Sequence, residues 1–208
     1  YWNQVTPENA GKWGSVESTR DVMNWAELDE AYALAKANNF PYKHHVLVWG
    51  NQQPEWITAL PAEEQLEEIL EWFNAVNERY EAIDFIEVVN EFDNDPPNLA
   101  NDGPGYIDAL RLFNPQTTLE LISQFESDGL STPEATDKAA NFDWIINAFQ
   151  MARNIFPSST RLMFNEYNVI NSTSRTDLAI ELANLLKARG LIDDFGFQGH
   201  AFSTTGPN

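Results

Sequence analysis

Short apolar runs alternate along the chain with longer segments in which apolar residues recur at helical spacing. The strand candidates are rich in apolar and β-branched residues and lie at 2–6, 42–49, 85–89, 161–164 and 195–198. Between them, a period of about 3.6 residues predicts helices around 28–35, 66–80, 145–155 and 178–186. This alternation favours parallel strands joined by crossover helices. Continuous apolar strands also fit a parallel sheet that is buried on both faces.

The pattern is compatible with two α/β architectures, an open doubly wound sheet and part of a barrel, and periodicity does not separate them. One stretch, 93–141, departs from the alternation because it contains many Pro and Gly residues. Only 117–125 has a helical pattern there, so we interpret 93–141 as a long loop or insertion. Otherwise we expect residues 1–208 to form a single domain.

Polar and aromatic residues gather within the ends of the strand candidates or directly after them. In chain order they are Glu8, Asn9, Lys12, His45, Trp49, Gln52, Asn90, Glu91, Glu166, Tyr167, Gln198 and His200. In α/β proteins the ligand site lies at the carboxyl ends of the strands. Acids and amides hydrogen-bond hydroxyl groups, and Trp and Tyr rings stack on sugar faces. The pattern therefore predicts a cleft for carbohydrate.

These segments resemble glycoside hydrolase family 10, a family of (β/α)8-barrel endo-β-1,4-xylanases. The matching motifs are TPENAGKW at 6–13, HVLVWGNQ at 45–52, EVVNE at 87–91, MFNEYN at 163–168 and GFQGH at 196–200. They are similar to the family's second to sixth strands and occur in the same order. The resemblance implies a partial (β/α)8 TIM barrel, an incomplete catalytic domain from which the first strand and the last two strands are absent.

The resemblance also implies an endo-acting, retaining mechanism on β-1,4-xylan that uses two carboxyl groups and no cofactor. Glu91 would be the general acid/base, and Asn90 would contact the sugar 2-hydroxyl. The nucleophile is expected beyond Asn208. Sugar contacts are implied for Glu8, Asn9, Lys12, His45, Trp49, Gln52, Tyr167, Gln198 and His200. Because Glu91 follows an apolar strand, we expect burial to raise its pKa.

Three features depart from the family's pattern. The family commonly has His after the third-strand Trp, where this chain has Gly50. Its fifth-strand motif commonly reads Asn-Asp-Tyr, where this chain has Glu166 in place of Asp. The loop after the acid/base is usually shorter than 93–141. Glu166 would be either a partner that tunes Glu91 or His200, or part of a structural salt bridge.

Structural interpretations exist beside the functional ones. Glu91 would otherwise be a cap or loop acid, and Glu8 a first-turn acid that favours the helix dipole. Trp49 would otherwise belong to the core, as we expect of Trp2, Trp25, Trp72 and Trp144. His45 and His200 form a conceivable metal pair, but we favour sugar contacts and expect no metal. His44 points away from His45 along a strand, so we expect a structural histidine with its hydrogen bonds satisfied.

Composition narrows the function classes. The formal net charge of −20 disfavours nucleic acid and anionic membranes and suits a neutral polysaccharide. There is no Cys, and no apolar run is long enough to span a bilayer. The alternatives are a β-1,4-glucanase and a non-catalytic carbohydrate-binding protein on the same fold. A nucleotide-binding enzyme is disfavoured because no Gly-rich phosphate loop follows a strand.

The resemblance further implies a secreted or periplasmic protein, monomeric when complete. The chain begins abruptly at Tyr1 inside a strand candidate, so we expect a piece of a longer protein. An incomplete barrel leaves strand edges open. We therefore expect residues 1–208 alone to be unstable or to need a complementing segment.

Overall fold

The computed structural model describes residues 3–97 and 105–200, and its centre is a four-stranded parallel sheet of strand order β1-β2-β3-β4. The strands are β1 (Lys43–His44), β2 (Phe85–Asn90), β3 (Arg161–Glu166) and β4 (Asp194–Phe197). Val5 adds a parallel bridge to Tyr42 on the outer side of β1. All five predicted strand positions therefore pair in the expected order, although the first contributes only this bridge. Trp2 lies outside the described residues.

Helices follow the strands as the periodicity predicts. They are α1 (Trp13–Val16), α2 (Ala26–Ala37), η1 (Glu55–Ala59), α3 (Ala62–Arg79), α4 (Ile107–Phe113), α5 (Gln116–Ser127), α6 (Thr132–Ala140), α7 (Asp143–Ile155) and α8 (Thr173–Ala188). Helix α7 packs against β2 and β3 and also contacts α3, α4 and α5. The four predicted helices correspond to α2, α3, α7 and α8.

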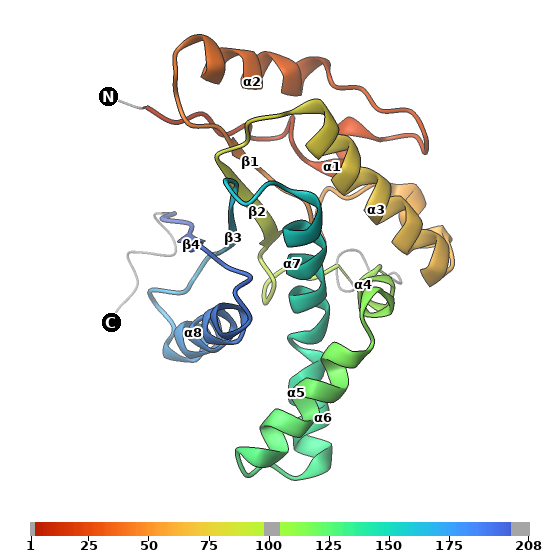
Figure 1. Ribbon diagram of the computed structural model, residues 1–208, viewed down its shortest axis with the longest axis vertical. Helices are drawn as coiled ribbons and strands as arrows, with labels where there is room; N and C mark the ends of the chain where they lie inside the picture. The colour runs from red at the N-terminus through yellow and green to blue at the C-terminus, as the bar shows by residue number, and fades with distance from the viewer. Residues whose placement is uncertain (1–2, 98–104, 201–208) are drawn as a thin grey trace.

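The interpretation of 93–141 as a long loop is wrong from residue 107 onward, where α4, α5 and α6 form, although α5 contains the stretch 117–125 that was predicted to be helical. Pro115 precedes α5, and a capping box between Ser131 and Glu134 starts α6. The apolar faces of α5 and α6 are buried, and Figure 1 shows the two helices side by side at the end of the molecule farthest from α2. Local capping signals and a buried face therefore outweigh the Pro and Gly content.

The core surrounds the sheet and includes a row of aromatic rings. Trp72 is fully buried, and its ring stacks on Trp13 at 6.1 Å and on Trp25 at 5.9 Å between centroids. Trp144 is also buried. Among the described tryptophans, the predicted core positions of Trp25, Trp72 and Trp144 are confirmed, Trp25 being half-buried.

His44 is buried as predicted, but the expectation that its hydrogen bonds are satisfied is wrong. Within the described part of the chain, neither ring nitrogen has a hydrogen-bond partner. Burial lowers the pKa of His44 to about 3, with a smaller contribution from neighbouring His45. The side chain is therefore a neutral core ring 5.9 Å from that of Trp72.

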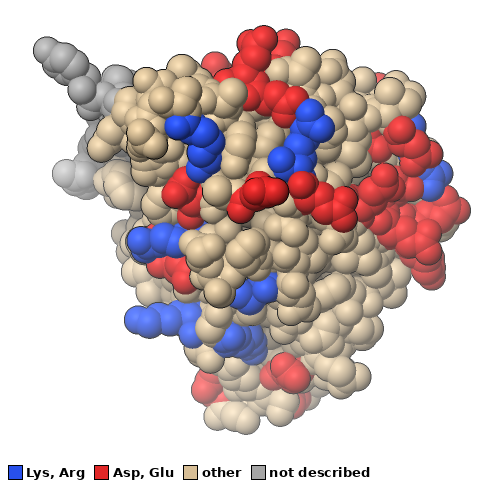
Figure 2. Space-filling view, turned by 45° about the horizontal axis from the view of Figure 1, so that its top comes forward, with Lys and Arg blue, Asp and Glu red and all other residues tan. Residues whose placement is uncertain are grey.

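The outermost strand, β4, and the surface charge are two further features of the molecule. In the described ranges, β4 pairs only with β3, and its Phe195 and Phe197 are more than half exposed. Figure 2 shows acidic side chains gathered densely along one edge of the molecule, with basic side chains interspersed. No helix within the described residues combines the length and apolar content that a membrane crossing requires.

Candidate active site

Glu91 follows the last residue of β2 in a conformation that L-residues seldom adopt. Its φ is 53°, and its backbone N–H donates to the Asn165 carbonyl at 2.8 Å. Gln52 and Asn168 also have positive φ, at 54° and 59°. Such conformations are costly and cluster at functional sites. At Glu91, Gln52 and Asn168, three positions predicted to follow strands, the backbone therefore leaves the direction of the sheet at its carboxyl edge.

Side chains from two other strand ends hold the Glu91 carboxyl group. Gln198, after β4, donates from Nε2 to Glu91 Oε1 at 2.6 Å. Trp49, beyond β1, donates from Nε1 to Glu91 Oε2 at 3.0 Å. Glu91 is only 7% exposed. The geometry therefore brings together three predicted site residues and places Trp49 at the cleft, half-buried, rather than in the core.

The surroundings of Glu91 favour its protonated form. Burial is the largest cause that raises its pKa, and the nearby Asp95 carboxyl group raises it further. Hydrogen bonds from Gln198 and Asn90 lower it, without cancelling the rise. A carboxyl group with a raised pKa can donate a proton near neutral pH.

Asn90 and Gln198 belong to one amide network beneath Glu91. Asn90 Oδ1 accepts from Asn165 Nδ2 at 3.0 Å and from Gln198 Nε2 at 3.3 Å. Gln198 Oε1 lies 2.6 Å from Nε2 of the exposed His200. The structure thus gives Gln198 a role in orienting Glu91, beyond the sugar contact implied by sequence. Asn165 lies in the quoted MFNEYN motif but was not singled out.

Lys12 and Trp49 form a second part of the same edge. Lys12 Nζ donates to Asn9 Oδ1 at 2.7 Å and lies 4.9 Å from the Trp49 ring centroid. Burial lowers the pKa of Lys12, although Glu8 and Glu91 oppose this. Glu8 and Asn9 are exposed, and Gln52 lines a small depression with Lys12 and Trp49.

His45 is oriented by a carboxylate that sequence reasoning missed. Glu87 on β2 is buried and contacts both His45 Nδ1, at 2.5 Å, and Lys43 Nζ. Burial raises the pKa of Glu87, but these two partners outweigh it and the net pKa is lowered. Because Glu87 contacts Nδ1 of His45, the orientation of the imidazole ring is set and Nε2 is the nitrogen that can bind another group. The sequence does contain a signal for this role, because Glu87 is an acid inside the apolar run 85–89.

Glu166 has neither of the two expected partners. It is buried and accepts hydrogen bonds from the backbone N–H groups of Asp93 and Tyr167, at 3.0 and 2.8 Å, and from Asn94 Nδ2 at 2.5 Å. Burial raises its pKa, although these donors oppose the rise. Glu166 therefore anchors the loop that follows Glu91.

Tyr167 lies half-buried near the carboxyl groups of this edge. Burial raises its pKa most, followed by Asp95 and Glu91. These effects favour the neutral phenol over its anion.

The described residues do not bring His45 and His200 together as metal ligands, because His45 is paired with Glu87 and His200 with Gln198. The one group of acids spaced for a cation in the described ranges is Glu17, Asp21 and Glu68, with oxygens within 4.8 Å of one another. Glu17 already accepts from Trp13 and Glu68 from Arg20, at 2.8 and 2.7 Å.

Parallel strands that present a buried carboxyl group, amides and an aromatic ring at their carboxyl edge fit part of a (β/α)8 barrel with a polar site at the strand ends. The model of glycosyl hydrolase family 10 matches residues 1–208, and the chain belongs to this family. It is 37% identical over 201 residues to endo-1,4-beta-xylanase B of Cellvibrio japonicus, covering 96% of this chain and 27% of that protein. It is 30% identical to endo-1,4-beta-xylanase A of Fusarium oxysporum f. sp. lycopersici, covering 98% of this chain and 53% of that protein.

Solved structures give the same fold. A family 10 structure from Paenibacillus barcinonensis superposes with a TM-score of 0.72 at 25% identity, covering 96% of this chain and 54% of that one. A glycosylated endo-beta-1,4-xylanase of the same family from Gloeophyllum trabeum gives a TM-score of 0.70 at 25% identity, covering 96% and 53%. The chain thus spans about half the length of these two structures.

Proposed function

We propose that the protein to which these residues belong is an endo-1,4-β-xylanase that retains anomeric configuration. The observation that carries the proposal is Glu91, a buried carboxyl group with a raised pKa at the carboxyl edge of the sheet. Family membership and the two xylanase relatives support xylan as the substrate.

In the first step, Glu91 gives its proton to the glycosidic oxygen while the bond from that oxygen to the anomeric carbon breaks. A second carboxylate attacks the anomeric carbon; retaining enzymes place it about 5–5.5 Å from the acid. We expect it from a part of the barrel outside residues 1–208. In the second step, ionised Glu91 takes a proton from a water molecule as the water oxygen bonds to the anomeric carbon. The bond from that carbon to the second carboxylate breaks, and the sugar is released with its original configuration.

The other residues of the edge bind and orient the sugar. Trp49 offers an aromatic face, and Lys12, His45 and Tyr167 offer donors to sugar hydroxyl groups. Gln198 and Asn90 hold the acid in place from beneath. Because xylan is a neutral polymer outside the cell, we propose a secreted or periplasmic enzyme that acts as a monomer.

The test is Glu91→Gln in the full-length protein. It should reduce kcat/KM on xylan by at least about 100-fold, the typical contribution of a general acid. Release of dinitrophenol from an aryl xylobioside should fall much less in the first turnover, because that leaving group needs no proton. Glu67→Gln, an exposed acid on α3, is the matched control and should change neither rate.

Other outcomes would redirect the proposal. Equal loss on both substrates would remove Glu91 from the acid role. Faster cleavage of β-1,4-glucan than of xylan would indicate a glucanase. Xylan binding by the wild-type protein without hydrolysis would indicate a carbohydrate-binding protein.

A further inference from the structure

Trp49 is the residue at which the chain ends its pairing with β2, beside Glu91. The preceding residue, Val48, is still paired: its N–H donates to the Val88 carbonyl and its carbonyl accepts from Asn90 N–H, both at 3.0 Å. The backbone groups of Trp49 are bound by a side chain from another part of the molecule. Because backbone N–H and carbonyl groups away from water need partners, the residue that supplies them helps to fix the position of Trp49.

One hydroxyl group, that of Tyr106, binds both backbone groups of Trp49. Tyr106 Oη accepts from Trp49 N–H at 3.2 Å and donates to the Trp49 carbonyl at 3.0 Å. A tyrosine hydroxyl group can do both only while it carries its proton. Burial raises the pKa of Tyr106 far above its usual value. The hydroxyl group therefore keeps both hydrogen bonds at neutral pH.

The position of Tyr106 is set by packing against two helices. Its side chain is buried, and its ring meets that of Trp13 on α1 edge-on, at 5.9 Å between centroids. The carbonyl of the preceding residue, Gly105, accepts from Gln65 Nε2 on α3 at 3.2 Å. The Tyr106 carbonyl accepts from Leu110 N–H at 3.2 Å, in the first turn of α4. The ring therefore holds its hydroxyl group at a fixed point.

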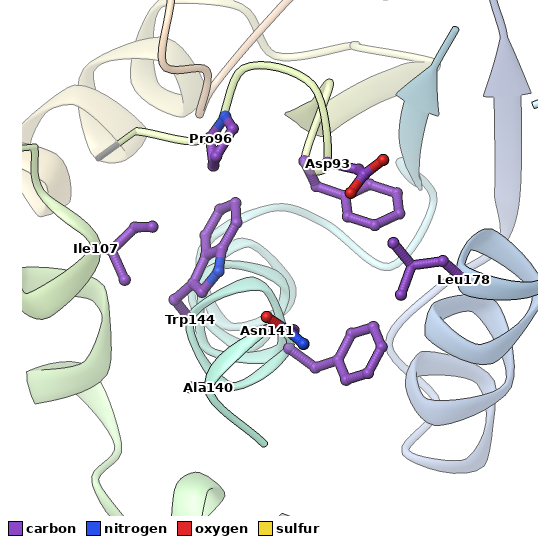
Figure 3. A pocket seen from close by; sticks show the side chains of 9 residues that line it. Asp93, Pro96, Ile107, Ala140, Asn141, Trp144 and Leu178 are labelled. Carbon is purple, nitrogen blue, oxygen red and sulfur yellow. The ribbon is translucent and has the colours of Figure 1, made fainter. Parts of the chain in front are cut away.

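The residue after Tyr106 points to a different region. Figure 3 shows the Ile107 side chain beside a cavity of about 290 Å³, together with Pro96 and Trp144. Tyr106 lines instead the small depression that Trp49 also lines, at the carboxyl edge of the sheet. The start of α4 therefore directs one side chain to the candidate active site and the next to the cavity.

Trp49 links Tyr106 to the proposed acid. Its indole Nε1 donates to Glu91 Oε2 at 3.0 Å, and Lys12 Nζ lies 4.9 Å from the ring centroid. The indole is one rigid group, so a shift of the Trp49 backbone moves its aromatic face and its N–H donor together. Tyr106, which is 57 positions away in sequence, thus influences both without touching Glu91 through any printed contact of its own hydroxyl group.

We propose that Tyr106 is a positioning residue that sets the orientation of the Trp49 indole, and through it the aromatic face offered to the sugar and the hydrogen bond to Glu91. The part that concerns the sugar rests on the proposed function. Tyr106 exchanges no proton in the reaction. The start of α4, which lies within the segment interpreted from sequence as a loop, thereby supports the candidate active site.

The first test is the indole N–H signal of Trp49 in ¹H–¹⁵N NMR spectra of the ligand-free, full-length protein, assigned by its loss in Trp49→Phe. Tyr106→Phe keeps the ring and removes the hydroxyl group, so the signal should shift upfield as the hydrogen bond to Glu91 weakens. Ile107→Val is the matched control, because it alters the same turn of α4 on its cavity side. A signal that does not move in Tyr106→Phe, or that moves equally in Ile107→Val, would overturn the proposal.

The second test is a double-mutant cycle on kcat/KM for xylan. Tyr106→Phe should lower kcat/KM about tenfold, since it leaves two backbone groups of Trp49 without their partner. In a Trp49→Ala background the same substitution should change kcat/KM by less than about twofold, because no indole remains to be oriented. Equal losses in the two backgrounds would show a merely structural role and would refute the proposal.

Tyr80→Phe is the matched control for loss of a buried tyrosine hydroxyl group. Tyr80 Oη donates to Asp29 at 2.9 Å, at the opposite end of α3 from Gln65, and its loss should leave kcat/KM unchanged. The NMR test needs no turnover, so the two proposals can fail separately. A shifted indole signal without xylan hydrolysis would reject only the enzyme, and normal hydrolysis with an unshifted signal would reject only the role of Tyr106.

Discussion

At the scale of single residues, the chemistry of the site depends on the partners of one carboxyl group. Asp95 and burial raise the pKa of Glu91, whereas Gln198 and Asn90 lower it. Glu91 is both the acid and the base of the proposed mechanism, so its pKa must serve both steps. The side-chain amides of Gln198 and Asn90 therefore lower the pKa of Glu91, and the carboxyl group of Asp95 raises it.

Substitution of Gln198 should shift the pH dependence of the enzyme toward the alkaline side. Gln198→Met removes the donor to Glu91 Oε1, which stabilises the ionised carboxylate. Glu91 then stays protonated to higher pH, and the alkaline limb of kcat/KM on xylan should move up by roughly 0.5–1 pH unit. A limb that moves down, measured from pH 4 to 10, would contradict the assigned role of this hydrogen bond.

Glu87 gives a prediction about stability. Glu87→Gln removes the charge that pairs with Lys43 and His45, and breaking such a buried pair costs about 3 kcal/mol. The folded pKa of Glu87 is lowered, so its contribution is complete above the unfolded-state value and is lost as pH falls through the folded value. Urea unfolding at pH 7 and pH 3 should show a smaller difference between wild type and variant at pH 3; an equal difference would contradict this.

Part of the site could be predicted from sequence. Trp49, Glu91 and Gln198 lie at or just after the ends of strand candidates, and parallel strands must bring such positions to one edge. The partners of Asp95, Glu87 and Glu166 could not be predicted in this way. Glu87 meets His45 across 42 positions and Glu166 meets Asp93 across 73, and such contacts depend on strand register and loop path.

At the scale of elements, helices were found where an apolar stripe is long. Helix α3 has 18 residues and a clear stripe, so its period is evident. Helices α4 and α6 have seven and nine residues, too few for a reliable period. The capping box at Ser131 was the signal that would have revealed α6. Strand β1 is shorter than its apolar run because only Lys43 and His44 pair regularly with β2.

Helix α6 provides a test of this capping interaction. Ser131→Ala removes the hydroxyl group that completes the box with Glu134, which should cost about 1 kcal/mol of unfolding free energy. Ser127→Ala, at the end of α5, removes an exposed hydroxyl that donates to the Ser123 carbonyl and should change stability by less than about 0.5 kcal/mol. An equal change in Tm for the two variants would show that the capping box does not stabilise the folded state.

At the scale of the whole molecule, the strong negative charge should influence substrate choice. The chain carries 32 acidic and 12 basic residues, and Figure 2 shows acids across one face with a dense group at one edge. Such a field repels anionic polymers over about 30 Å at 0.01 M salt but only about 3 Å at 1 M. A neutral xylan approaches without this repulsion.

Glucuronic acid substituents on xylan should therefore reduce kcat/KM more at low salt than at high salt. The ratio of kcat/KM on plain xylan to that on glucuronoxylan is expected to fall several-fold between about 0.01 and 1 M NaCl. The rate on plain xylan over the same range is the control for general salt effects. A ratio independent of salt would show that the surface charge has no part in selectivity.

The central claim is a retaining hydrolysis of xylan in which Glu91 serves first as acid and then as base. The most direct test is ¹H NMR of the anomeric protons released from xylohexaose by the full-length enzyme, recorded before mutarotation. Retention predicts that the β-anomer appears first and the α-anomer only as it equilibrates. Initial release of the α-anomer would show inversion, and the proposed mechanism would be wrong.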